Sequence, residues 1–170
     1  MLLKKDSHNG LKEEVVSVLR LLASVSTIQK AITEAEALAP LIALTVDGSG
    51  ALKEEATRAL GSLAAHSDIK VKIAELGGIP PLIVLVRDGQ KGRSSLKEAA
   101  ALALGNLAMN AMNKVKIAEE GGVAPLVALV SEGSAQAREV AAVALGNLAT
   151  NIDNQHEIAD AGGIPPLVKL

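Results

Sequence analysis

The run His66-Ser67-Asp68 contains the three residue types of a hydrolytic triad, so it is the first place to look for catalysis. Neighbouring residues on a helix point in different directions, whereas the groups of a triad converge in space. Gly48-Ser49-Gly50 lacks both the G-x-x-x-x-G-K-[ST] pattern of a phosphate loop and a preceding strand, and we expect it to be a linker. His8 and His156 are isolated and Cys is absent, so neither a metal site nor a Cys nucleophile is expected. We therefore expect no enzymatic activity and no cofactor.

The composition argues against several classes of partner. Phe, Tyr and Trp are absent, so no aromatic side chain is available for a nucleic-acid base to stack on. A formal net charge of −2 gives no electrostatic attraction to phosphate. The longest apolar runs, such as residues 79–86, are far shorter than the ~20 residues that span a bilayer, and the N-terminus lacks the apolar segment of a signal peptide. We expect no nucleic acid or membrane partner, and the lack of Cys favours an intracellular location, cytoplasmic, nuclear or both.

An internal repeat dominates the sequence. GGIPPL at residues 77–82 returns as GGVAPL 44 residues later and as GGIPPL after a further 41 residues, and a weaker copy, EALAPL, precedes the first by 41 residues. A second block keeps the same register: ALGSLA at 59–64 matches ALGNLA at 103–108 and 144–149, with VLRLLA at 18–23 as a degenerate copy. Extra residues in the loop 89–95 explain the longer spacing. A repeat of this period predicts a solenoid.

Each unit is predicted to form three helices. The first spans about 113–120, and Gly121-Gly122 ends it with a turn that L-residues resist. The second contains Pro125 in its first turn, where the missing N–H costs little, and ends near 131. The third spans about 135–150, with one apolar face at three- and four-residue steps. One unit cannot bury its apolar faces alone, so stacked units should form a superhelix with a concave surface.

The GG-I-PPL turn, the A-L-G-N-L-A third helix and the period of about 41 residues resemble armadillo repeats of the importin-alpha and beta-catenin type. HEAT repeats are the nearest alternative, but their two-helix unit usually lacks the short first helix and the GG turn. The resemblance implies an all-α fold, a right-handed α-solenoid whose third helices line a groove for extended peptides.

In this register the chain forms a single array. Residues 1–26 are the end of a second helix and a third helix; residues 27–67, 68–109 and 110–150 are complete repeats; residues 151–170 are a partial repeat. The C-terminal stretch IPPLV at 164–168 has none of the polar residues that cover terminal repeats. We therefore keep, as an alternative function, a structural module that self-associates head to tail.

The resemblance places Asn106 and Asn147 at the position that holds the main chain of a bound peptide. An Asn amide has both donors and an acceptor, so it can pair with peptide N–H and C=O. Ser62 and Leu21 stand at the equivalent positions, which makes Ser62 a weak member of the set and leaves Leu21 without the function. The alternative is that each Asn bonds locally near its helix end.

Residues four before and four after these positions complete the predicted peptide site. Importin-type armadillo proteins usually have Trp four residues earlier, and this chain does not, so recognition of nuclear-localisation signals is not expected. The corresponding residues here are Arg58, Leu102 and Val143 before, and His66, Asn110 and Asn151 after.

Two further sets of residues recur in register. Glu13, Glu54, Glu98 and Glu139 each follow a basic residue. We interpret them as first-turn residues of third helices that complement the helix dipole, or alternatively as a rim of alternating charge along the groove. Glycines at 61, 105 and 146 each cost ~1 kcal/mol in a helix. This predicts that a neighbouring helix approaches closely at each; the alternative is that the position is exposed and glycine is merely tolerated there.

Overall fold

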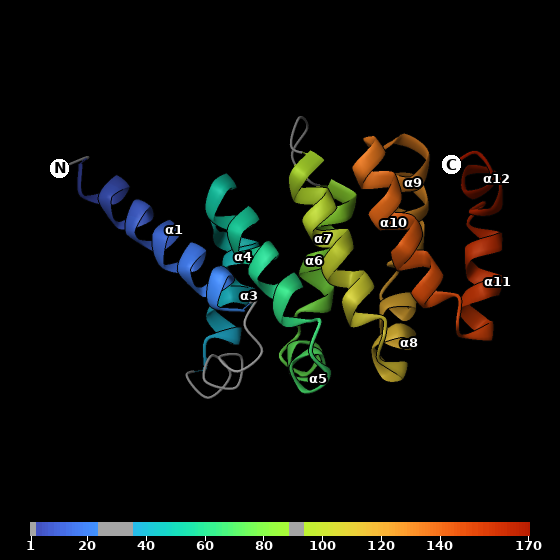
Figure 1. The fold of residues 1–170 in the computed structure, drawn as a ribbon, viewed down its shortest axis with the longest axis horizontal. Helices are drawn as coiled ribbons and strands as arrows, with labels where there is room; N and C mark the ends of the chain where they lie inside the picture. The colour runs from blue at the N-terminus through green and yellow to red at the C-terminus, as the bar shows by residue number, and fades with distance from the viewer. Residues whose placement is uncertain (1–2, 24–35, 89–93) are drawn as a thin grey trace.

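The computed structural model describes residues 3–23, 36–88 and 94–170, apart from the side chains of 3–9, 11 and 23. All regular structure in these ranges is α-helical (Figure 1). The helices are α1 (Leu3–Ala23), α3 (Leu38–Asp47), α4 (Gly50–Leu63), α5 (Ser67–Glu75), α6 (Ile79–Asp88), α7 (Ser94–Leu107), α8 (Ala111–Glu119), α9 (Val123–Glu132), α10 (Ala135–Leu148), α11 (Ile152–Asp160) and α12 (Ile164–Val168).

The helices form an elongated α-solenoid, as the repeat predicts. Third helices α4, α7 and α10 lie side by side in one row, which α1 extends at the N-terminal end (Figure 1). Each packs against the second helix of its own unit, α4 on α3, α7 on α6 and α10 on α9. First helices α5 and α8 lie along one edge (Figure 1). No helix in the described part of the chain is both long and apolar enough to cross a membrane.

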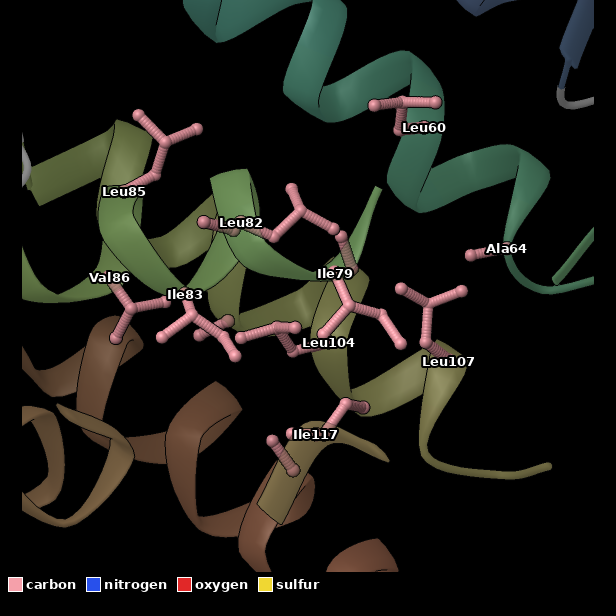
Figure 2. Close-up of a cluster of buried hydrophobic side chains, with 14 of the residues drawn as sticks. Leu60, Ala64, Ile79, Leu82, Ile83, Leu85, Val86, Leu104, Leu107 and Ile117 are labelled. Carbon is pink, nitrogen blue, oxygen red and sulfur yellow. The ribbon is translucent and has the colours of Figure 1, made fainter. Parts of the chain in front are cut away.

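One continuous core runs between the repeats, built from aliphatic side chains alone. Figure 2 shows how three units contribute to it: Leu60 from α4, Ile79 from α6 and Leu104 from α7, and Ile117 from α8. These four side chains are at most 1% exposed. Because each unit buries its apolar faces against its neighbours, the stacking itself holds the third helices in register.

The two glycines of the GG turn between the first and second helices have different roles. Gly77, Gly121 and Gly162 have φ values of 78°, 76° and 73°, the left-handed region that glycine tolerates best. The second glycine is required for space, since a Cβ on Gly78 would lie 2.6 Å from Cγ2 of Ile73. The predicted GG turn is confirmed, and Glu36 takes the first position of the degenerate copy with φ 54°.

The predicted close approach at the third-helix glycines is confirmed at Gly105, is an ordinary van der Waals contact at Gly61, and is wrong at Gly146. A Cβ on Gly105 would meet Cα and Cβ of Ala144 at 3.3 Å, and one on Gly61 would meet Cβ of Ala103 at 3.6 Å. At Gly146 nothing lies within 4 Å, because no third helix follows α10 in the structure.

The N-terminal segment differs from the prediction. Residues 3–23 form one continuous helix, α1, instead of the end of a second helix followed by a separate third helix. The positions that correspond to the linker at 48–50 are Ser7, His8 and Asn9, which lack the flanking glycines that end α3 and open α4. The helix therefore continues through the place where other units turn.

Candidate functional site

Asn106 and Asn147 occupy the same register position on neighbouring third helices, and the structure gives them the same contact. Nδ2 of Asn106 donates to the carbonyl of Gly61 at 2.9 Å, and Nδ2 of Asn147 donates to that of Gly105 at 2.9 Å. Each acceptor belongs to the last turn of the preceding third helix. The local bonding that the sequence left as an alternative is therefore replaced by a bond between repeats.

This bond leaves part of each Asn amide available. A primary amide carries two N–H groups and an oxygen with two lone pairs, and the bond to the glycine uses one N–H. Within the described residues, no group donates to Oδ1 of Asn106 or Asn147 in the hydrogen bonds seen, and both side chains are only half-buried. Each Asn therefore offers one acceptor and one donor, already oriented by its neighbour.

The two N-terminal helices, α1 and α4, have no Asn at the position of Asn106 and Asn147. Ser62 has the equivalent position on α4, but its hydroxyl donates to the carbonyl of Arg58 in the same helix, at 3.2 Å. Leu21 on α1 is 57% exposed and has no side-chain amide. Among the described third helices, α7 and α10 therefore carry an Asn amide at this position.

Apolar side chains flank the Asn positions one turn earlier. Leu102 is 48% exposed and Val143 is 57% exposed, and each lies four residues before its Asn on the same helix face. Arg58, at the same position on α4, pairs with Glu54 at 2.9 Å. A groove of 330 Å³ crosses the third helices at Leu102, but Val143, Asn106 and Asn147 do not line it. Its lining residues are Arg20, Arg58, Gly61, Ser62, Ser95, Glu98, Ala99, Leu102, Gln136 and Val140.

Asn110 and Asn151 begin the first helices. Oδ1 of Asn110 accepts from the backbone N–H groups of Met112 and Asn113, at 3.0 and 3.1 Å. Asn151 caps α11 in the same way. An Asn directly before a helix is a known cap signal, so this role can be read from the sequence. His66 holds the corresponding position before α5 without a side-chain cap bond to that helix.

The prediction that the recurring Glu residues lie in the first turn of a third helix is wrong. The helices α4, α7 and α10 begin four residues before Glu54, Glu98 and Glu139, and none has an acidic residue in its first turn. Oε1 of Glu98 instead accepts from the hydroxyl of Ser134 at 2.7 Å, while Ser134 caps α10 by accepting from the N–H of Ala137. Glu13 accepts from the hydroxyl of Ser49 at 3.0 Å in the same manner.

A second set of inter-repeat bonds lies on the first helices and was not predicted. Asn113 is 4% exposed and donates to the carbonyl of Lys70 at 3.0 Å. Asn154 is 3% exposed and donates to the carbonyls of Lys114 and Leu148, both at 3.2 Å. The signal was an Asn at the same register position in two successive units.

Burial shifts the pKa values of two ionisable groups on the first helices, outside the groove. Burial lowers the pKa of Lys70 and raises the pKa of Glu157, and both belong to first helices. Neither group lines the groove on the third helices, so these shifts affect stability and do not indicate a reactive site.

Comparison with known proteins agrees with the geometry. The armadillo/beta-catenin-like repeat family matches residues 66–109 and 110–150. An engineered protein of known crystal structure is 30% identical with a TM-score of 0.89, covering 95% of this chain and 66% of its own. A designed armadillo repeat protein is 28% identical with a TM-score of 0.87, over 93% and 67% of the two chains. Another, solved in complex with the peptide (KR)4, is 30% identical with a TM-score of 0.85, over 92% and 66%.

This chain thus spans about two thirds of the length of these solved structures. No curated protein sequence matches it. The repeat family covers half of the chain, and the likeness to the designed armadillo proteins extends over nearly all of it. The chain belongs to the armadillo repeat family.

Proposed function

We propose that this chain is a non-enzymatic scaffold that binds an extended peptide along its third helices, with Asn106 and Asn147 holding the peptide main chain. The observation that carries the proposal is the shared bond of these two amides to the preceding glycine carbonyls, at 2.9 Å each. The bond fixes both amides in one orientation and leaves the same donor and acceptor available on each.

The chemistry of an extended peptide fits this arrangement. In an extended chain the N–H and C=O of one residue point to the same edge, and alternate residues point to opposite edges. Oδ1 of an Asn can accept from the N–H, and the second Nδ2 hydrogen can donate to the C=O. Because the glycine bond already restricts the amide, less side-chain entropy is lost on binding.

A solved relative supports the proposal. A designed armadillo repeat protein 30% identical to this chain is in complex with the peptide (KR)4. That protein is longer than this chain. For this chain we propose only the class of ligand, an extended peptide, and a cytoplasmic or nuclear location. Nucleic acid and membranes are not proposed partners.

The experiment is retention of a random octapeptide library by the immobilised chain. Wild type should retain a defined peptide population, and N106A/N147A should lose at least tenfold, because each Asn loses one accepted and one donated peptide bond of about 1 kcal/mol each. The matched control is N113A, which removes an inter-repeat Asn bond of the same kind on a first helix. All variants are compared at a temperature where circular dichroism shows them folded. Equal retention by N106A/N147A and wild type would refute the Asn assignment.

A second candidate function is end-to-end self-association. Ile164, Val168 and Leu170 are 58%, 80% and 57% exposed, and the space beside Gly146 is open. Continuing the solenoid with a second copy would bring α1 against α10, with Val18 at the position of Ala103 and Ala144. Val18 is larger than the Ala103 and Ala144 that pack beside glycine in the interior contacts, so this function ranks second. Sedimentation of the full chain and of a chain lacking residues 164–170 tests it: self-association that disappears on trimming supports it, and a monomer at all concentrations refutes it.

A further inference from the structure

We infer that a groove between α1 and α3 binds helix α12 of a second copy of this chain, so that copies stack head to tail. This N-terminal groove has a volume of about 500 Å³, and Lys12 is the charged residue among the aliphatic residues that line it. The inference rests on the second candidate function above and names the two surfaces that meet. It is independent of peptide binding by Asn106 and Asn147.

The walls of the N-terminal groove have counterparts that hold a second helix inside the array. Helix α3 packs against both α4 and α6. One repeat of 41 residues earlier in the sequence, α4 and α6 correspond to α1 and α3. Among the lining residues, Leu19 corresponds to Leu60 of α4. Leu41 corresponds to Leu82 of α6, and both interior residues are at most 1% exposed. The N-terminal groove is therefore the counterpart of the place that α3 occupies.

Lys12 indicates that the occupant is a helix whose C-terminal end lies beside it. In each of the three following units, the corresponding basic residue donates to a backbone carbonyl in the last turn of the second helix of its own unit. These bonds run from Lys53 to Val46 at 2.8 Å, from Lys97 to Arg87 at 3.3 Å and from Arg138 to Val130 at 3.1 Å. A cation at this place also complements the helix dipole. Lys12 is thus positioned to do the same for a helix in the groove.

Helix α12 exposes an apolar residue that its counterparts bury. Val168 is 80% exposed, whereas the corresponding residues of α3, α6 and α9 are at most 8% exposed. In the interior this residue packs against the second glycine of the GG turn that follows, since a Cβ on Gly78 would lie 3.3 Å from Cδ1 of Ile42. Ala37 has the place of that glycine in the N-terminal groove. Binding of α12 there would bring Val168 against Ala37 and remove its apolar surface from water, which is favourable.

A second copy is the partner that the sequence of α12 favours. Residues 164–167 repeat the Ile-Pro-Pro-Leu of residues 79–82 at the start of α6, and α6 packs against both α7 and α9. The docked α12 would have the same two neighbours in the next copy, α1 and α3. Val18 would then lie beside Gly146, where the interior contacts have Ala, so the association should be weaker than the packing within one chain.

The first test is cross-linking between copies, for which a sequence without Cys makes single introduced cysteines specific. The full chains A37C and V168C are mixed, one of them carrying a tag that distinguishes mixed dimers by size, and treated with a short bis-maleimide. Mixed dimers should form at least tenfold faster than from A37C and V115C. Val115 is the matched control, because it is a 39% exposed aliphatic residue on α8 and does not line the N-terminal groove.

The second test is sedimentation of the full chain over a range of concentrations. V168E should weaken self-association at least tenfold, because it places a charge on the surface that the groove buries. V84E is its matched control and should leave self-association unchanged, since Val84 is a 44% exposed aliphatic residue on α6 and does not line the groove.

The outcomes separate this inference from the functions on which it builds. Self-association that V168E leaves unchanged, or cross-linking no faster with V168C than with V115C, would overturn the binding of α12 in the N-terminal groove while the second candidate function stands. A wild-type chain that stays monomeric at all concentrations would overturn both and leave the groove to a helix of another protein. Peptide retention that depends on Asn106 and Asn147 is measured separately from these tests.

Discussion

The side-chain amide of Asn147 donates to the backbone carbonyl of Gly105, forty-two residues earlier, at 2.9 Å. Gly105 also lets Ala144 approach, since a Cβ there would lie 3.3 Å from the Cα of Ala144. One glycine thus supplies the space and the acceptor that join two third helices. Asn106 repeats the relationship with Gly61. The structural contact and the proposed peptide contact therefore depend on the same side chain.

Alanine at two equivalent glycines should have different effects. G146A should stabilise the chain by about 0.5–1 kcal/mol, because Gly146 is helical and a Cβ there meets nothing within 4 Å. G105A should lose this gain, because its Cβ is forced against Ala144 and the helices must shift. Urea unfolding of both variants measures the difference. Equal stabilisation by the two substitutions would show that the close approach costs nothing.

Ser134 is expected to contribute to stability through two bonds at once. S134A removes the cap of α10 and the hydroxyl that Glu98 accepts from, so it should cost about 1–2 kcal/mol. S131A is the control, since Ser131 bonds only within its own helix, to the carbonyl of Val127. Thermal unfolding gives the comparison, and a cost for S134A no greater than that for S131A would contradict the account.

Glu36 stands where the other units have a left-handed glycine. Its φ of 54° is unfavourable for an L-residue, so E36G should stabilise the chain by about 1 kcal/mol. The reverse substitution, G121A, should destabilise it, because Gly121 has φ 76°. Chemical denaturation of both variants tests the pair; a destabilised E36G would mean that the Glu36 side chain makes contacts worth more than the backbone strain.

The burial of Glu157 predicts that the folding stability of the chain depends on pH. Burial raises its pKa above the ordinary value of 4.5, so the folded state binds its proton more tightly than the unfolded state does. This group therefore makes stability fall as pH rises from 4.5 through the raised pKa, and the penalty is complete above it. E157Q should be more stable than wild type at pH 7, and the gap should narrow as the pH falls towards 4.5. Urea unfolding at both pH values checks this, and a gap that is the same at both would refute the assignment.

Much of the fold was predictable because its causes are local or periodic. The GG turns, the helix boundaries near 135–148 and the close packing at Gly105 follow from residues that repeat every 41 to 44 positions. The hydrogen-bond partners of the side chains were harder to predict from the sequence. Asn113 bonding Lys70 and Glu98 bonding Ser134 depend on groups about forty residues away, whose juxtaposition is set by how the repeats stack.

The candidate site was predictable in position and less so in chemistry. Register alone placed Asn106 and Asn147 on one face, but the bond that holds each amide to the preceding helix needed the structure. Gly146 shows the limit of reasoning from the repeat: its residue type matches Gly105, yet it has no neighbour because α10 is the last third helix in the structure.

The most direct test of the central claim is an N-methyl scan of the octapeptide that wild type retains most strongly. If Oδ1 of Asn106 and Asn147 each accept a peptide N–H, methylation at two positions on one edge of the peptide should weaken binding by roughly fivefold each, the equivalent of about 1 kcal/mol. The same methylations should cost nothing further with N106A/N147A. Equal tolerance of N-methylation at every position by wild type would contradict main-chain recognition by these two residues.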